Sequence, residues 1–258
     1  MTPQRIFKIV FVFWLIGWYS KISFFKEYLW GITIERPLHY SFFPEIFTNP
    51  LTAQAAYVMP VLALVLVFLK TPLRYCWIAG VWIVSSLLML GHLNTYNDAT
   101  FVTSFWTAGW LFGLAWNLNP KDETVREQAQ FSARCIVGMI FLGGLAGKLT
   151  PEYWNGDVFY HTHILQGQAG IWLWLRQHST PEQMLIIARY FSQIAMAAEA
   201  FLVLSPVLPS RFVLTAAPAV MSGIVLFNTW RIFSVFACLI GILLACLIWE
   251  LSAKRTGT

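Results

Sequence analysis

Eight long apolar segments constrain the fold of this chain more than any other feature. They cover approximately residues 4–20, 53–70, 75–92, 100–117, 131–148, 183–205, 211–228 and 231–250. Several have 17 or 18 residues, at the short end of what spans about 30 Å of hydrocarbon at about 1.5 Å per residue. Lipid offers no hydrogen-bond partner to the backbone, and the segments lack the alternation of barrel strands. The sequence therefore predicts an all-α, polytopic transmembrane helix bundle with about eight membrane-spanning helices.

The composition supports a membrane protein. The chain has 258 residues, of which 58% are hydrophobic and 11% charged, against about 25% charged residues in a soluble domain. The formal net charge of +5 needs no nucleic acid to explain it. In membrane proteins, Lys and Arg residues are in excess in the cytoplasmic loops between the helices. The sequence shows no internal repeat, so residues 1–258 are predicted to form a single integral membrane domain.

The basic residues predict the topology. With eight spans both termini lie on one side of the membrane, and that side collects ten of the seventeen Lys and Arg residues. These are Arg5, Lys8, Lys70, Arg74, Lys121, Arg126, Arg134, Arg211, Lys254 and Arg255. Because basic loops stay inside, both termini are predicted to be cytoplasmic. A bacterial inner membrane is the expected location, with the endoplasmic reticulum as the alternative.

Two long connections, residues 21–52 and 149–182, then face outward. Both mix Trp, Tyr and Phe with scattered charges, which is typical of amphipathic helices that lie in the membrane interface. They either simply cover the helix bundle or close the top of a cavity that opens to the outer leaflet.

A few ionisable residues are predicted to lie at or near membrane depth. Glu199 is the clearest, since a carboxylate near a helix centre costs about 2.5–3.5 kcal/mol and must be paired, protonated or turned into the bundle. Lys148 ends the fifth apolar segment, Arg231 begins the eighth, and His92 and Asp98 flank the third and fourth. Lys148 and Arg231 are anchors at span ends in the simplest interpretation, and Glu199 is a structural partner for one of them.

The residues before Lys148 favour a functional interpretation. They read GGLAG, and such small residues allow a helix or a flat ligand to approach closely. Burial favours the neutral form of a lysine amine, which can then accept a proton near neutral pH. The histidines in HTH (His161 and His163) are spaced i, i+2 and do not face the same way on a helix, so no metal site is predicted.

The segment FLGGLAGKLTPEYWNG, residues 141–156, resembles the signature of the HTTM family, the membrane domain related to vitamin K-dependent gamma-carboxylase. The matching residues are Gly143, Gly144, Lys148, Leu149, Glu152, Trp154 and Gly156. The resemblance implies that Lys148 is the base that deprotonates a reduced quinone. It also places Glu199 where the family has an acidic residue in the sixth helix. The segments HYSFFPEIFTNPL and RIFSVFACLIG resemble further parts of the family in order and spacing.

The chain departs from that family in one important loop. The carboxylase has an Asn-Asn-His run between its third and fourth membrane segments. Here the sequence reads NTYNDATF, so Asn97 matches but Asp98 replaces the histidine that the family ties to carboxylation. The nearest competing resemblance is to the smaller DoxX and DoxD membrane proteins, which show a similar Gly-Leu-x-Lys-Leu pattern.

Two functions follow as hypotheses. The first is a membrane enzyme, an oxidoreductase or a carboxylase-like lyase, which binds a lipid quinol of the menaquinone or vitamin K type as its cofactor. The second is a non-catalytic lipid- or quinone-binding subunit that docks a redox, periplasmic or secreted partner, with Lys148 and Glu199 as a structural ion pair. The catalytic candidates are Lys148, Glu199 and Asp98. The substrate-binding candidates are Asn97, His92, Trp154, Gly144 and Arg231.

Overall fold

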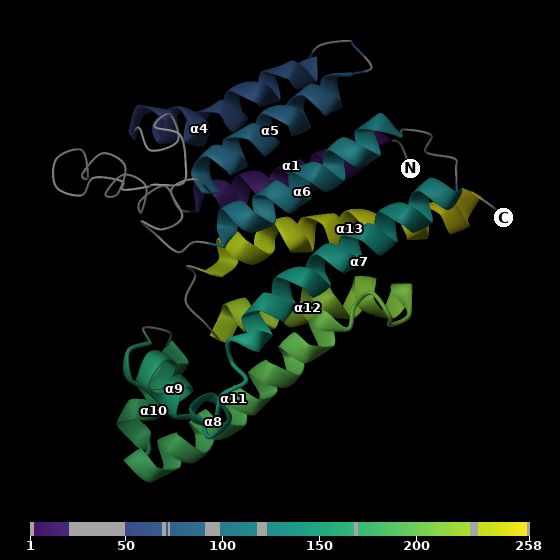
Figure 1. Ribbon diagram of the computed structural model, residues 1–258. Helices are drawn as coiled ribbons and strands as arrows, with labels where there is room; N and C mark the ends of the chain where they lie inside the picture. The colour runs from purple at the N-terminus through teal and green to yellow at the C-terminus, as the bar shows by residue number, and fades with distance from the viewer. Residues whose placement is uncertain are drawn as a thin grey trace. The chain divides into compact units, whose positions relative to one another are not determined.

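The computed structural model describes residues 3–20, 50–68, 71, 73–90, 99–117, 123–167, 170–227 and 232–256. Every regular element in these ranges is a helix, which confirms the predicted all-α class (Figure 1). Each of the eight apolar segments forms a helix. They are α1 (Pro3–Tyr19), α4 (Pro50–Ala63) continued by the 3₁₀ turn η2 (Leu64–Phe68), α5 (Arg74–Leu90), α6 (Thr100–Trp116), α7 (Glu123–Ala146), α11 (Pro181–Val203), α12 (Ser210–Phe227) and α13 (Phe233–Thr256).

Three of these helices, α7, α11 and α13, are long and apolar enough to cross a membrane. Shorter apolar helices cover residues 54–68, 74–90 and 210–226. Membrane character is therefore supported, while the number of eight spans stays a prediction. Helix α7 differs from its predicted segment because it begins at Glu123 and ends at Ala146, two residues before Lys148.

The helices form two compact units. One comprises Met1–Ser132 with Ser234–Thr258, and the other comprises Ala133–Phe233. The lysine signature and the whole connection between α7 and α11 belong to the second unit. This division into two units does not test the predicted single domain, which stays a prediction.

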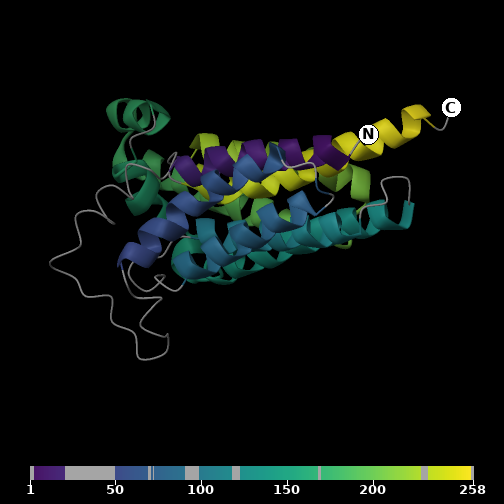
Figure 2. The same cartoon turned by 90° about the horizontal axis from the view of Figure 1, so that it is seen from above.

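In the first unit, α1 and α13 pack closely through glycines. A Cβ added at Gly17 would lie 2.9 Å from the Ala237 Cβ and 3.1 Å from the Ser234 carbonyl oxygen. One added at Gly241 would lie 2.8 Å from the Phe13 Cβ. Small residues let membrane helices approach in this way, and Figure 2 shows the two helices side by side.

Buried hydroxyl groups link helices of this unit through hydrogen bonds. Ser104 on α6 accepts hydrogen bonds from the indole N–H groups of Trp14 on α1 and Trp82 on α5. The Ser86 hydroxyl donates to the same oxygen at 3.1 Å. Because a polar atom without a partner is costly in an apolar interior, these contacts fix how α1, α5 and α6 pack.

In the second unit, α7 and α11 run antiparallel and lie against each other. A Cβ at Gly138 would lie 2.9 Å from the carbonyl oxygen of Val203, at the end of α11. The Arg134 guanidinium on α7 donates to the carbonyls of Ser205, Pro206 and Leu208, with the Leu208 contact at 2.7 Å. This cation satisfies the carbonyls that follow the C-terminus of α11, where a positive charge is favourable.

The connection between α7 and α11 folds into short helices with their own core. These are α8 (Pro151–Trp154), α9 (Asp157–Phe159), the π-helix η3 (Tyr160–Leu165) and α10 (Gly170–His178). Their buried side chains pack against the first half of α11, and the core consists of Phe159, Ile164, Trp172, Leu175, Met184 and Ala188. The predicted position of this connection in the membrane interface stays a prediction. The other predicted outer connection lies mostly outside the described residues.

Gly156, in the lysine signature, is required by the backbone at this connection. Its φ is +89°, a left-handed conformation that a side chain disfavours. An added Cβ would also lie 2.4 Å from the backbone nitrogen of Arg189 on α11. The glycine therefore allows the chain after α8 to turn directly against the α11 backbone.

We expect Gly17→Ala to destabilise the protein, because its methyl group would overlap Ala237 and the Ser234 carbonyl. Overpacking of this kind costs about 1–3 kcal/mol. The matched control is Gly80→Ala on α5, where an added Cβ meets nothing within 4 Å. Thermal unfolding in detergent should show a lower midpoint for Gly17→Ala and an equal or higher one for Gly80→Ala. Equal midpoints for the two variants would contradict the close contact of α1 with α13.

Candidate active site at the end of helix α7

Helix α7 ends just before Lys148 for local reasons. Three glycines lie in its last turn and beyond, and Pro151 then disfavours a helical conformation at Thr150. Thr150 is extended, with φ −123° and ψ 151°, and its side-chain oxygen accepts a hydrogen bond from the Tyr153 backbone N–H. Thr150 thus caps α8, and residues 147–150 form a break between two helices.

Lys148 lies in this break and forms an ion pair with Glu199 of α11. Its Nζ is 2.9 Å from both Oε1 and Oε2 of the carboxylate, and 3.1 Å from the Gly144 carbonyl oxygen. The three hydrogens of an ammonium group therefore have three acceptors. A carboxylate and a carbonyl both interact favourably with a positive charge at this position.

The ion pair is mostly shielded from solvent. The Glu199 side chain is 10% exposed and the Lys148 side chain 26% exposed. The ring of Tyr153 lies near the ammonium group, with its centroid 5.8 Å from Nζ. The Ser192 hydroxyl donates to the Tyr153 carbonyl, which holds α8 against α11. Both charged groups thus lie on a rigid support, between α7, α8 and α11.

Gly144 leaves one side of the ion pair open. A Cβ added there would lie 3.7 Å from both the Lys148 Nζ and the Glu199 Oε2. The absence of a side chain at Gly144 thus leaves room beside the charged groups, while the approach of a flat ligand stays a prediction. At Gly143, one position earlier, an added Cβ meets nothing within 4 Å.

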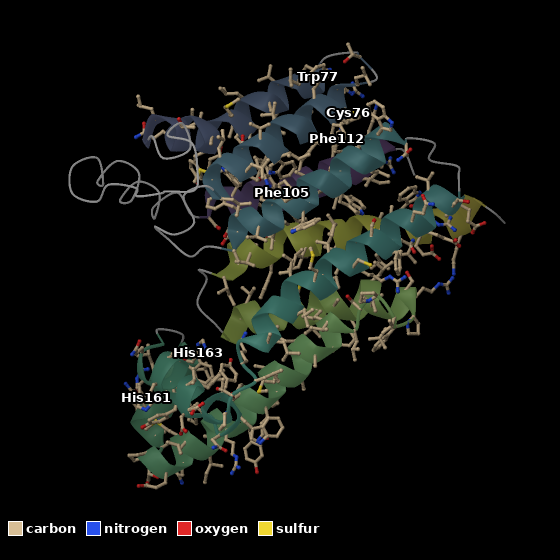
Figure 3. All side chains as sticks on the ribbon, in the orientation of Figure 1. Cys76, Trp77, Phe105, Phe112, His161 and His163 are labelled. Atoms are coloured by element: carbon tan, nitrogen blue, oxygen red, sulfur yellow. The ribbon has the colours of Figure 1, made fainter. Side chains whose placement is uncertain are left out.

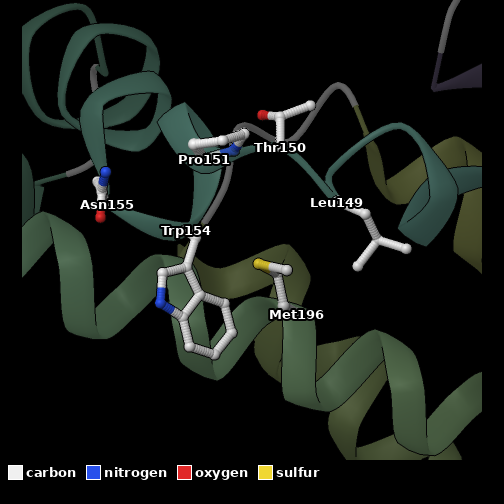
Figure 4. A pocket seen from close by; sticks show the side chains of 6 residues that line it. All are labelled: Leu149, Thr150, Pro151, Trp154, Asn155 and Met196. Atoms are coloured by element: carbon white, nitrogen blue, oxygen red, sulfur yellow. The ribbon is translucent and has the colours of Figure 1, made fainter.

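A pocket lies next to the ion pair. It has a volume of about 440 Å³ and is lined by Leu149, Thr150, Pro151, Trp154, Asn155 and Met196. Met196 is one helical turn before Glu199 on α11, so the two residues share a face of that helix. In Figure 4 the Trp154 indole and the Met196 side chain lie next to each other. The volume is within the range of about 300–1,000 Å³ that is typical of small-molecule sites.

The structure brings together four of the predicted site residues. Lys148, Glu199 and Gly144 meet at the ion pair, and Trp154 lines the pocket beside it. The other four, Asp98, Asn97, His92 and Arg231, lie outside the described residues and stay predictions. Sequence reasoning missed Met196 and Tyr153. The three-residue interval from Met196 to Glu199 was the available signal for Met196, because residues at i and i+3 share a face of a helix.

His163 is electrostatically linked to the ion pair. It lies on η3 together with His161 (Figure 3), and its ring contacts Phe159 with centroids 4.5 Å apart. Burial lowers the pKa of His163, and the positive charge of Lys148 lowers it further. Among the described residues, no group of three or more His, Cys, Asp and Glu side chains could hold a metal ion.

Comparison with known proteins identifies no family for this site. No protein-family model, no curated protein and no solved structure matches the chain. The resemblance to the HTTM family and the competing resemblance to DoxX and DoxD proteins therefore stay hypotheses.

We expect a strong energetic coupling between Lys148 and Glu199. Lys148→Met leaves the carboxylate without its cation, and Glu199→Met leaves the cation without its carboxylate. Each variant should lower the free energy of unfolding by about 1–3 kcal/mol, because the pair is partly exposed. The double variant removes both charges and should cost less than the sum of the two. Chemical unfolding in detergent micelles measures all three. Purely additive effects would contradict the ion pair.

Protonation of His163 should reduce stability. Its pKa in the folded protein is below the ordinary value of 6.5, so the unfolded chain binds the proton first as the pH falls. The contribution of His163 is therefore present above about pH 6.5 and is lost as the pH falls through the folded pKa. Thermal unfolding between pH 7.5 and 5 should show a smaller loss for His163→Gln than for the wild type. By NMR titration, Lys148→Met should raise the pKa of His163, and no change would contradict the link.

Proposed function

We propose that this protein binds a reduced lipid quinone of the menaquinol or vitamin K hydroquinone type, with the quinol ring next to the Lys148–Glu199 pair. The observation that carries the proposal is the shielded ion pair itself, with Nζ at 2.9 Å from both carboxylate oxygens and with Gly144 leaving one side accessible. An apolar pocket next to the pair supports a ligand that is itself mostly apolar.

The proposed chemistry is removal of a proton from the quinol. The quinol O–H bond breaks, the proton goes to the ion pair, and a quinolate anion remains. Glu199 is the acceptor while Lys148 is charged, and Lys148 is the acceptor after it has passed its own proton to Glu199. In either order the pair gains one proton, and the positive charge that it then carries stabilises the quinolate. Such proton transfer contributes about 10²–10⁴-fold in rate.

The quinolate is a stronger reductant than the quinol. Dioxygen or a redox protein would take its electrons in an oxidoreductase, whereas a carboxylase-like lyase would use the anion to generate a stronger base. Asp98, Asn97, His92 and Arg231 stay candidate residues from the sequence, and the proposal does not depend on them. We further propose a bacterial inner membrane location with cytoplasmic termini, which the distribution of basic residues supports.

One observation favours a second candidate function. The three hydrogens of the Lys148 ammonium group already have acceptors, so the pair is complete without a ligand. Under this alternative the pair is structural, and the protein is a non-catalytic lipid- or quinone-binding subunit that docks a periplasmic or secreted partner.

The test uses purified protein in detergent with menaquinol. We expect oxidation of the quinol above the rate of empty micelles, and a loss of at least tenfold for Lys148→Met and Glu199→Gln while size-exclusion profiles stay unchanged. Binding of menaquinol without turnover, unaffected by Lys148→Met, would support the subunit instead. If no quinol binds, the enzyme and the quinone-binding subunit are both rejected, and only a lipid-binding subunit is left.

Gly144→Leu provides a second variant that leaves both charged groups in place. Its side chain would cover the open side of the ion pair and should abolish turnover and reduce binding. Gly143→Leu is the matched control, because it adds the same side chain one position earlier on the helix, where an added Cβ meets open space. Equal activity of the two variants would show that the ligand does not approach across Gly144.

A further inference from the structure

The contacts between α7, α8 and α11 define a common register along α11. Gly138 of α7 lies against Val203 at the C-terminal end of α11, and Gly144 lies next to Glu199. The chain then continues in the same direction after α7 has ended. The Tyr153 carbonyl accepts from Ser192, and Gly156 lies against the backbone of Arg189. Residues 138–156 therefore follow α11 from its C-terminal end toward its N-terminal end.

This register gives the depth of the break if α11 crosses the membrane. Arg189 and Tyr190 are exposed, and an exposed arginine with an adjacent tyrosine is typical of the membrane interface rather than the hydrocarbon. Leu204, at the other end, follows the last residue of α11. At about 1.5 Å per residue, Glu199 lies about 7 Å from Leu204, within the candidate span of α11. If α11 crosses the membrane, the ion pair is thus at membrane depth, and residues 149–156 lie on the outer side of the pair.

Helix α7 therefore ends inside the membrane and not at its surface. Non-helical backbone is tolerated at that depth only where protein satisfies it or where it lines a cavity. Both conditions hold at the break. The Lys148 backbone N–H donates to the Leu145 carbonyl, and the Trp154 N–H donates to the Thr150 carbonyl. The pocket of about 440 Å³ lies at the same residues.

The rim of this pocket is apolar and exposed. Leu149 is 67% exposed and Trp154 is 52% exposed, while Met196 in the wall is buried. Ile194, two residues before Met196 on α11, is 62% exposed. At membrane depth, side chains of this kind contact lipid. The pocket thus opens on the surface of the unit that faces the hydrocarbon, one helical turn from Glu199.

We propose that the break at residues 147–150 and helix α8 continue α7 as a discontinuous membrane segment, and that its pocket is a lateral opening that holds the prenyl chain of a lipid quinol. The identity of the ligand rests on the proposed function, whereas the membrane depth of the segment does not. The prenyl chain lies against Leu149, Trp154 and Met196, and the ring extends from there to the ion pair. The ligand reaches Lys148 from the bilayer and not from water.

The depth is tested with spin labels on single cysteines in lipid vesicles, after the four native cysteines have been replaced by alanine. Leu149→Cys and Trp154→Cys report on the segment. The controls are Ile194→Cys for the lipid-facing surface and Gln177→Cys, on α10, for the outer aqueous side. We expect labels at 149 and 154 to be accessible to oxygen but not to a water-soluble nickel complex, as at 194. Accessibility to the nickel complex, as at 177, would overturn the discontinuous membrane segment.

The ligand is tested by comparing a prenylated naphthoquinol with its analogue that lacks the tail. Trp154→Ala removes an exposed wall of the pocket, and Trp174→Ala removes an exposed tryptophan of α10 outside it. We expect Trp154→Ala to weaken binding of the prenylated form about tenfold and to leave the tail-free form unchanged, because only the prenyl chain loses apolar contact. Equal effects on both forms would overturn the assignment of the prenyl chain. Failure of the wild type to bind either form would reject the proposed function, while the labels would still decide the depth.

Discussion

Lipid provides neither hydrogen bonds nor solvation for charge, and this constraint organises the second unit of the chain. The Arg134 guanidinium lies against the carbonyls that follow α11, and Lys148 lies against Glu199 and the Gly144 carbonyl. Each cation satisfies backbone carbonyls at a helix end, which carries partial negative charge. The same two contacts join α7 to α11 at both ends of their shared surface. Structural support and the proposed chemistry therefore depend on the same charged groups.

The ion pair changes how a lysine base has to be understood at this site. A neutral amine in an apolar pocket would be a base by itself, and this was the expectation from the sequence. An amine at 2.9 Å from both oxygens of a carboxylate is instead half of a pair that shares its protons. In the proposed chemistry such a pair acts as one unit, and neither residue has an independent role. The open side at Gly144 gives a ligand access to both groups at once.

Much of the fold could be predicted because apolar periodicity and length are local properties. All eight apolar segments are helices, and the boundaries of most differ by a few residues from the predicted ones. Helix α7 was the exception, since its first turns carry Glu123 and Arg126 and do not look apolar. The short helices between α7 and α11 were not predicted either, because their core depends on Met184 and Ala188 of a later helix.

The sequence by itself determined the helical class of the protein and its helical segments, and it gave Lys148, Gly144 and Glu199 as candidate site residues. The candidates follow from small residues next to a charge and from the cost of a carboxylate in an apolar segment, whereas Trp154 was a candidate only through the family resemblance. Only the tertiary structure decided that Lys148 pairs with Glu199, and that Met196 forms a pocket with Trp154. The reason is that residues about fifty positions apart come together through the antiparallel packing of α7 and α11. Local patterns do not encode that register, which the close approach at Gly138 and Gly156 sets.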